Sequence, residues 1–83
     1  MDRPERTHNG RLFYREHDLI PIPRDIPDLG ISEGQRGLVK ALDFHNGRVL
    51  ALVKVNYSTG QTRGWVEMDV MPEQKVLSYS PAA

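Results

Sequence analysis

The chain has 83 residues, in which 11 Lys or Arg balance 11 Asp or Glu, and it has no cysteine. This length suits one small domain with a thin core, and the formal net charge of zero is unlike the basic excess of a dedicated nucleic-acid-binding domain. Disulfides, thiolate catalysis and Cys-ligated metal centres are excluded. The polar first residues and the shortness of every apolar run predict a cytoplasmic protein that does not enter a membrane.

The distribution of apolar residues predicts one domain between two short tails. Residues 1–16 are mostly polar and are expected to form a flexible N-terminal arm. Residues 17–79 hold the apolar runs and are expected to form the domain. Residues 80–83 are expected to be a disordered C-terminus.

The domain opens with residues 17–23, which suit a strand at the edge of a sheet because Pro21 and Pro23 remove backbone donors. Residues 24–33 then form a loop, in which three apolar side chains are expected to point inward: Ile26, Leu29 and Ile31. A loop of this length is either a functional element or a cover that closes the end of a small barrel. The sequence leaves both interpretations open.

Three strands joined by tight turns are predicted next, at residues 38–44, 48–57 and 63–67. Asn46-Gly47 and Ser58-Thr59-Gly60 supply the residues with positive φ that hairpin turns require between runs rich in Val, Leu and aromatic residues. The central strand is apolar on both sides in its first half and on one side in its second half.

Glycines and prolines indicate how the strands begin and end. Gly34 and Gly37 fit a turn where the chain enters a strand that passes close to a neighbour. Residues 68–71 break the alternation before Pro72 and predict one turn of 3₁₀ helix, after which residues 74–79 form a last short strand. Five short strands without a convincing α-helix predict an all-β barrel or sandwich.

Residues that could carry chemistry do not form a recognisable catalytic or metal-binding pattern. The histidines His8, His17 and His45 lack the spacing that would place two of them on one face. Three acids, Glu67, Asp69 and Glu73, follow Trp65 but are expected to be solvated in a polar turn. We therefore expect no enzymatic activity, no metal and no cofactor.

The glycine pattern Gly34-x-x-Gly37-x-Val39, together with the two hairpins and residues 63–66 (Arg-Gly-Trp-Val), resembles the SH3-like barrel superfold over residues 17–79. The likeness is greatest to small bacterial SH3-like barrel proteins of uncharacterised function, which also contain the Arg-Asp-Ile-Pro segment of residues 24–27. This resemblance implies a small five-stranded SH3-like barrel.

Two more distant resemblances lie within the same superfold. Residues 54–58 (Lys-Val-Asn-Tyr-Ser) are similar to a segment of photosystem I reaction-centre subunit IV, an extrinsic subunit that helps to dock ferredoxin. The spacing of Gly34, Gly37, Val39 and Leu42 is similar to the KOW motif of ribosomal and transcription-elongation proteins. The first implies a protein-binding accessory subunit, and the second implies a nucleic-acid-binding module.

Trp65 is the centre of the predicted binding surface. It shares a strand face with Glu67 while Val66 takes the other face, so the indole is expected to lie at least partly outward, although core packing is the alternative. Trp, Tyr and Arg dominate the energetics of protein interfaces. The predicted partner-binding residues are Trp65, Tyr57, Arg63, Arg36 and Glu67, together with the loop 24–33.

The leading hypothesis is a non-enzymatic accessory subunit that binds a protein partner, as a monomer or a homodimer. The alternative is a KOW-like or Tudor-like module that binds nucleic acid through its basic side chains, namely Arg36, Lys40, Arg48, Lys54 and Arg63.

Overall fold

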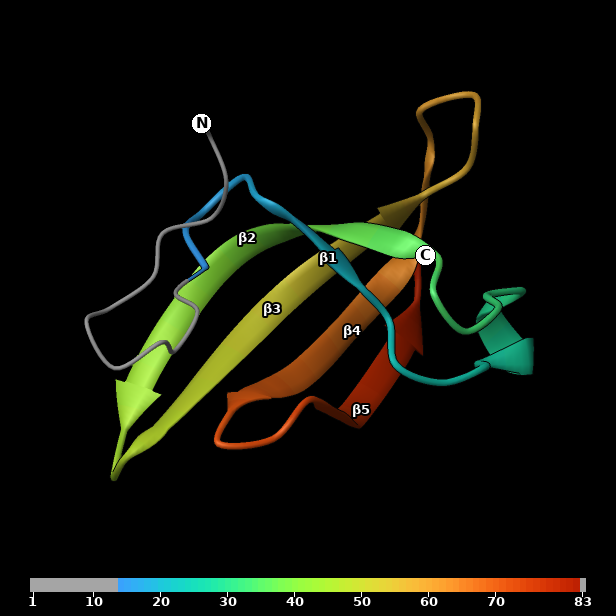
Figure 1. Ribbon diagram of the computed structural model, residues 1–83. Helices are drawn as coiled ribbons and strands as arrows, with labels where there is room; N and C mark the ends of the chain where they lie inside the picture. Colours follow the sequence, from blue (N-terminus) through green and yellow to red (C-terminus); the bar gives the residue numbers. More distant parts are fainter. Residues whose placement is uncertain (1–13, 83) are drawn as a thin grey trace.

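The structure is a computed structural model that describes residues 14–82, and these residues form one antiparallel sheet with almost no helix (Figure 1). The strands lie in the sheet in the order in which they occur in the chain. Their bounds are β1 Leu19–Pro21, β2 Arg36–His45, β3 Arg48–Asn56, β4 Thr62–Met71 and β5 Lys75–Pro81, with one 3₁₀ helix, η1, at Pro27–Leu29. The prediction of an all-β fold with five strands is confirmed.

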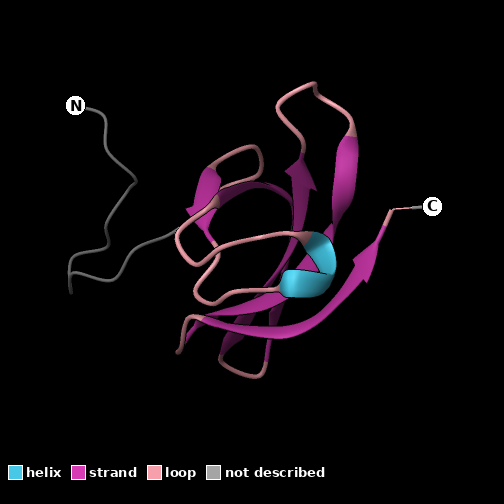
Figure 2. Cartoon of the chain, turned by 90° about the vertical axis from the view of Figure 1, so that its right-hand side faces the viewer, coloured by secondary structure: helices cyan, strands magenta, loops and turns pink. Residues whose placement is uncertain are grey.

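The sheet is open, because β1 and β5 form its two edges and no pairing joins them among the described residues. The loop that carries η1 lies at this gap, beside β5 (Figure 2). There the Tyr79 hydroxyl of β5 donates a hydrogen bond to the Asp28 carboxylate of η1, at 2.9 Å. A side-chain contact thus spans the opening, and a closed barrel remains a prediction.

The core lies on one side of the sheet, called here the inner face. β2, β3 and β4 contribute Val39, Ala51, Val53, Val55, Val66 and Met68 to it, and the segment from β1 to β2 covers them with Ile20, Ile22, Ile26, Leu29 and Ile31. The expectation that the apolar side chains of the loop 24–33 point inward is confirmed. The loop therefore acts as the second layer of the core.

Two expectations about the C-terminal half are wrong. Residues 68–71 form no 3₁₀ turn, since β4 continues to Met71 through a register shift against β3, in which Val70 is the extra residue that absorbs the break in alternation. Ser80 and Pro81, expected in a disordered tail, pair with Trp65 and Gly64 as part of β5. Of the predicted arm, residues 1–13 lie outside the described residues.

Two glycines allow the strands and the loop to approach one another closely. A Cβ at Gly37 would overlap the side chain of Val53. A Cβ at Gly64 would come within 2.7 Å of the Ser80 carbonyl oxygen and 3.0 Å of the Leu29 side chain. The expected close crossing at Gly37 is confirmed, and Gly64 makes a second one that joins β4 to the loop.

Replacing Gly64 by Ala is expected to lower the free energy of unfolding by about 1–3 kcal/mol, because the added methyl group forces β5 or Leu29 to shift. Denaturant unfolding followed by circular dichroism measures this change. Ser58→Ala, in an exposed turn, is the control and should stay within about 0.5 kcal/mol of the unchanged protein. Equal stability of the two variants would contradict the close approach.

Candidate protein-binding face

The side of the sheet opposite the core, called here the outer face, carries the predicted tryptophan. Val53 and Val66 are buried on the inner face, so strand alternation turns their neighbours to the other side. The outer face includes Leu38, Ala41, Leu52, Lys54, Trp65 and Glu67. Leu38, Lys54 and Trp65 form one cross-strand row, and Ala41, Leu52 and Glu67 form the next.

Four of these residues form two adjacent cross-strand pairs, called here the central block. Lys54 of β3 lies opposite Trp65 of β4, and Leu52 lies opposite Glu67. The two apolar side chains therefore occupy one diagonal of the block, and the two charged side chains occupy the other. Glu67 accepts a hydrogen bond from the Ser78 hydroxyl at 3.1 Å.

The central block exposes more apolar surface than a solvated sheet face requires. Leu52 is 40% exposed, and Trp65 is partly exposed, as the alternation with Val66 predicts. A large aromatic side chain beside an exposed leucine, with charges around them, is typical of the centre of a protein interface.

Arg63 and Tyr57 lie apart from this block. The Arg63 guanidinium stacks on the Tyr57 ring, 4.5 Å from its centroid, and donates a hydrogen bond from Nη1 to the Gly30 carbonyl at 2.6 Å. Its Nε is buried without a hydrogen-bond partner among the described residues. Arg63 therefore holds the loop 24–33 against the end of the β3–β4 hairpin.

A bulge in β4 explains why the Arg63 side chain does not lie on the outer face with Trp65. Val55 lies opposite Gly64, whereas the next residue, Asn56, lies opposite Thr62, so Arg63 is an extra residue in β4. An extra residue in one strand of a pair bends the strand and redirects its side chain. Alternation alone would place Arg63 beside Trp65, but its contacts lie with the loop.

Of the predicted partner-binding residues, Trp65, Glu67 and Arg36 belong to the outer face. Arg36 begins β2 opposite Pro21, two positions before Leu38, and is exposed. Tyr57 and Arg63 belong to the loop contact instead. The sequence assigned Lys54 to the nucleic-acid alternative and not to the protein-binding set, and it did not single out Leu52, although the apolar character of both sides of the central strand was a signal for Leu52.

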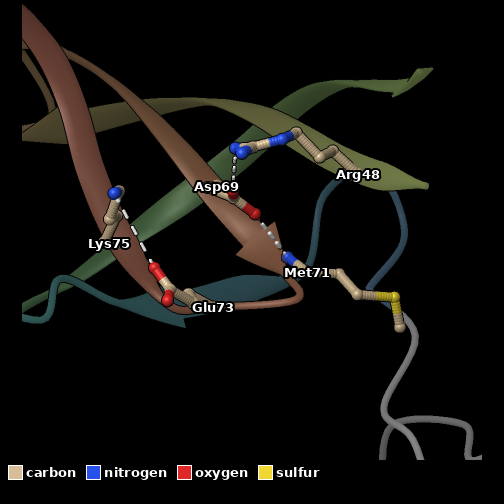
Figure 3. Close-up of polar contacts among 5 residues, drawn as sticks. All are labelled: Arg48, Asp69, Met71, Glu73 and Lys75. Atoms are coloured by element: carbon tan, nitrogen blue, oxygen red, sulfur yellow. Dashed lines mark hydrogen bonds and ion pairs between the residues drawn. The ribbon is translucent and has the colours of Figure 1, made fainter. Parts of the chain in front are cut away.

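The acids after Trp65 do not gather into one site. Asp69 was expected in a solvated turn, but it lies within β4, only 1% exposed. Its carboxylate accepts hydrogen bonds from Arg48 Nη1 at 2.8 Å and from the Met71 backbone N–H at 2.9 Å (Figure 3). Glu73 forms an exposed ion pair with Lys75 at 3.7 Å.

We expect Asp69→Ala to lower the free energy of unfolding by about 1–3 kcal/mol, because it leaves the Met71 N–H without its acceptor. Arg48→Ala should cost less than about 1 kcal/mol, since the Arg48 side chain is 54% exposed and solvent screens its charge. Denaturant unfolding of both variants and of the double variant measures these costs and their coupling. Equal costs for the two single changes would show that the ion pair, rather than the backbone contact, fixes Asp69.

The hydrogen bond from Tyr79 to Asp28 has a measurable electrostatic signature. The bond, and with it the negative charge of Asp28, raises the pKa of Tyr79 above its usual value of 10.0. Both effects favour the protonated phenol in the folded protein. Together with the Arg63 contact, this bond fixes both ends of the segment from Asp28 to Gly30 to the sheet.

This pKa shift predicts a loss of stability at alkaline pH. The folded-state pKa of Tyr79 is higher than its unfolded-state value, so the stabilisation is fully present below about pH 10 and disappears as pH rises through the folded-state pKa. The stability difference between the unchanged protein and Tyr79→Phe, measured by urea unfolding from neutral to strongly alkaline pH, should therefore shrink. A difference that does not vary with pH would contradict the shift.

A shallow hollow of about 400 Å³ lies at the β2–β3 hairpin, away from the central block. Its lining is mainly apolar and includes Phe44, Val49 and Met71, with Phe44 66% exposed. None of the predicted partner-binding residues lines it. Phe44 is therefore an exposed aromatic residue outside the outer-face site and a suitable control for Trp65.

Neither metal-binding geometry, nor a membrane-spanning helix, nor similarity to known proteins assigns a function to this chain. Within residues 14–82, His, Asp and Glu form no group that could hold a metal ion, and no helix is long and apolar enough to cross a membrane. Comparison of the chain with family models, with curated proteins and with solved structures gives no match. The SH3-like and KOW-like resemblances accordingly stay predictions.

Proposed function

We propose that this chain is a non-enzymatic protein-interaction module, a small cytoplasmic accessory subunit that binds a protein through the outer face around Trp65. The observation that carries the proposal is the central block, in which an exposed leucine and a partly exposed tryptophan lie on one diagonal on the side of the sheet opposite the core. Burial of this apolar surface would supply the affinity, and the charges of Lys54 and Glu67 would orient the partner.

The loop 24–33 has a supporting role in this proposal. Gly64 faces Leu29 of the loop, so the next residue, Trp65, faces the other side of the sheet. One partner surface that covers Trp65 does not reach the centre of the loop. The loop instead packs against β4 at Gly64, the residue next to Trp65.

The nucleic-acid alternative has less support. Arg48 is paired with the Asp69 carboxylate, and Arg63 is committed to the Gly30 carbonyl and the Tyr57 ring. Lys54, the most central of the remaining basic residues, has the acidic Glu67 on the facing strand of the same block. A phosphate backbone would meet this carboxylate when it approaches the lysine.

Trp65→Ala is expected to weaken binding of the protein partner by about 30-fold or more, as truncation of a central aromatic residue does at interfaces. The measurement is affinity capture of the tagged chain from cells that also contain the untagged chain, with nuclease, followed by mass spectrometry and titration of the recovered protein. Phe44→Ala, at an exposed aromatic residue outside the outer face, should bind normally.

Leu52→Ser provides a second test on the same face, and circular dichroism establishes that each variant is folded. Unchanged capture by both folded outer-face variants would refute the proposal. Capture that disappears with nuclease or with moderate salt would instead favour the nucleic-acid alternative.

A further inference from the structure

We infer that the protein bound by the outer face is a second copy of this chain, packed face to face about a two-fold axis that runs along the Leu52–Trp65 diagonal of the central block. This inference rests on the proposed function, since it names the partner of the same face. It comes from the arrangement of charged and apolar side chains in the block rather than from its apolar character alone.

A two-fold interface requires a surface that is complementary to itself. Two copies that pack face to face are related by a two-fold axis that lies in the plane between them. Rotation about this axis lays the residue pattern of one face over the other as its mirror image across the axis. Residues on the axis meet their own copies, and residues on either side exchange places. A self-complementary face therefore needs apolar residues along the axis and opposite charges on its two sides.

The central block has this pattern. Leu52 and Trp65 lie on the diagonal, so each would pack against its own copy. Lys54 and Glu67 lie on opposite sides of that diagonal, so Lys54 would lie over Glu67 of the partner subunit, and the reverse contact would form at the same time. Among the described residues neither Lys54 nor Glu67 has an ion pair within the chain, so both charges are available.

The margin of the face follows this symmetry in part, because the same reflection places Lys75 of one copy over Arg36 of the other, which are like charges. The reflection places Leu50 over Ala41 and Ser78 over Asn56, which pairs apolar with apolar and polar with polar positions. Asp43 falls on the axis at the edge of the face and would approach its own copy. Asp43→Asn is therefore expected to tighten the dimer.

The geometry is also one that sheets adopt. Strands about 4.8 Å apart and a two-residue step of about 6.7 Å place the diagonal at about 36° to the strands, so the two-fold axis turns the second sheet by about 70°. This crossing lies near the orthogonal class of sheet packing. In orthogonal packing the sheets are closest at the centre and diverge toward the corners, so the closest contact would fall on the central block.

Charge reversal tests the inference on the full chain by sedimentation equilibrium. Lys54→Glu and Glu67→Lys each place like charges together across the interface and should raise the dimer dissociation constant by about tenfold or more. An equimolar mixture of the two variants should recover the unchanged affinity, because each lysine then meets a glutamate. The double variant K54E/E67K should dimerise alone.

The matched control is the pair of exposed charges Arg24 and Glu33 on the loop 24–33, which covers the inner face on the other side of the sheet. Reversal there should leave the dissociation constant unchanged. A monomeric unchanged protein at millimolar concentration, or charge-reversed variants whose mixture dimerises no better than either variant alone, would overturn the inference.

The absence of cysteine allows a second measurement that does not depend on charge. Leu52→Cys places a thiol on the proposed axis, where sheets packed about 10 Å apart leave the two Cys residues too distant for a disulfide. A short bismaleimide that spans this gap should therefore convert the variant to a covalent dimer much faster than Thr59→Cys in the β3–β4 turn. Equal rates of cross-linking would contradict the axis.

The two proposals fail in different ways. If the chain is monomeric and a different protein is captured in a manner that depends on Trp65, the inference is wrong and the proposed function stands. If the chain is monomeric and nothing is captured, both are wrong. Capture of the untagged chain that Trp65→Ala abolishes supports both.

Discussion

A single sheet without a long helix has to bury one of its faces against its own strands and connecting segments, and the loop 24–33 supplies much of this cover. Ile26, Leu29 and Ile31 are buried against the inner face, where they complete a core that the strands alone would leave open to water. This packing explains the glycine at position 64, because Leu29 occupies the space that any side chain there would need. The thin core of so short a chain thus depends on a segment that contains only one turn of helix.

The same requirement explains what the polar residues near the loop do. Arg63 and Tyr79 bind it from β4 and β5, at the Gly30 carbonyl and the Asp28 carboxylate. These contacts fix the loop across the opening between β1 and β5, where no backbone pairing within residues 14–82 closes the sheet. Arginine and tyrosine are also typical of binding surfaces, but here they are engaged in holding the fold together.

Because the loop covers one face only, the other face keeps its apolar residues in solvent. Leu52 and Trp65 adjoin each other there, with Lys54 and Glu67 across their diagonal. A chain of zero formal net charge has no long-range attraction to a strongly charged partner. Binding specificity therefore has to come from the local placement of charges. A block with one cation and one anion is specific for a surface that carries the opposite charges at the facing positions, and a second copy of the same block is such a surface.

The sequence by itself determined the all-β class, the two hairpin turns and the inward direction of Ile26, Leu29 and Ile31, and it favoured an outward Trp65 while leaving core packing open. These features depend on local alternation and on turn residues, which the chain carries within a few positions. Tertiary structure decided that Arg63 leaves the tryptophan face, that Asp69 is buried, and that Lys54 and Leu52 join Trp65 and Glu67. Each of these depends on strand register and bulges, which are set by the packing of one strand against another and leave no periodic signal in either strand alone.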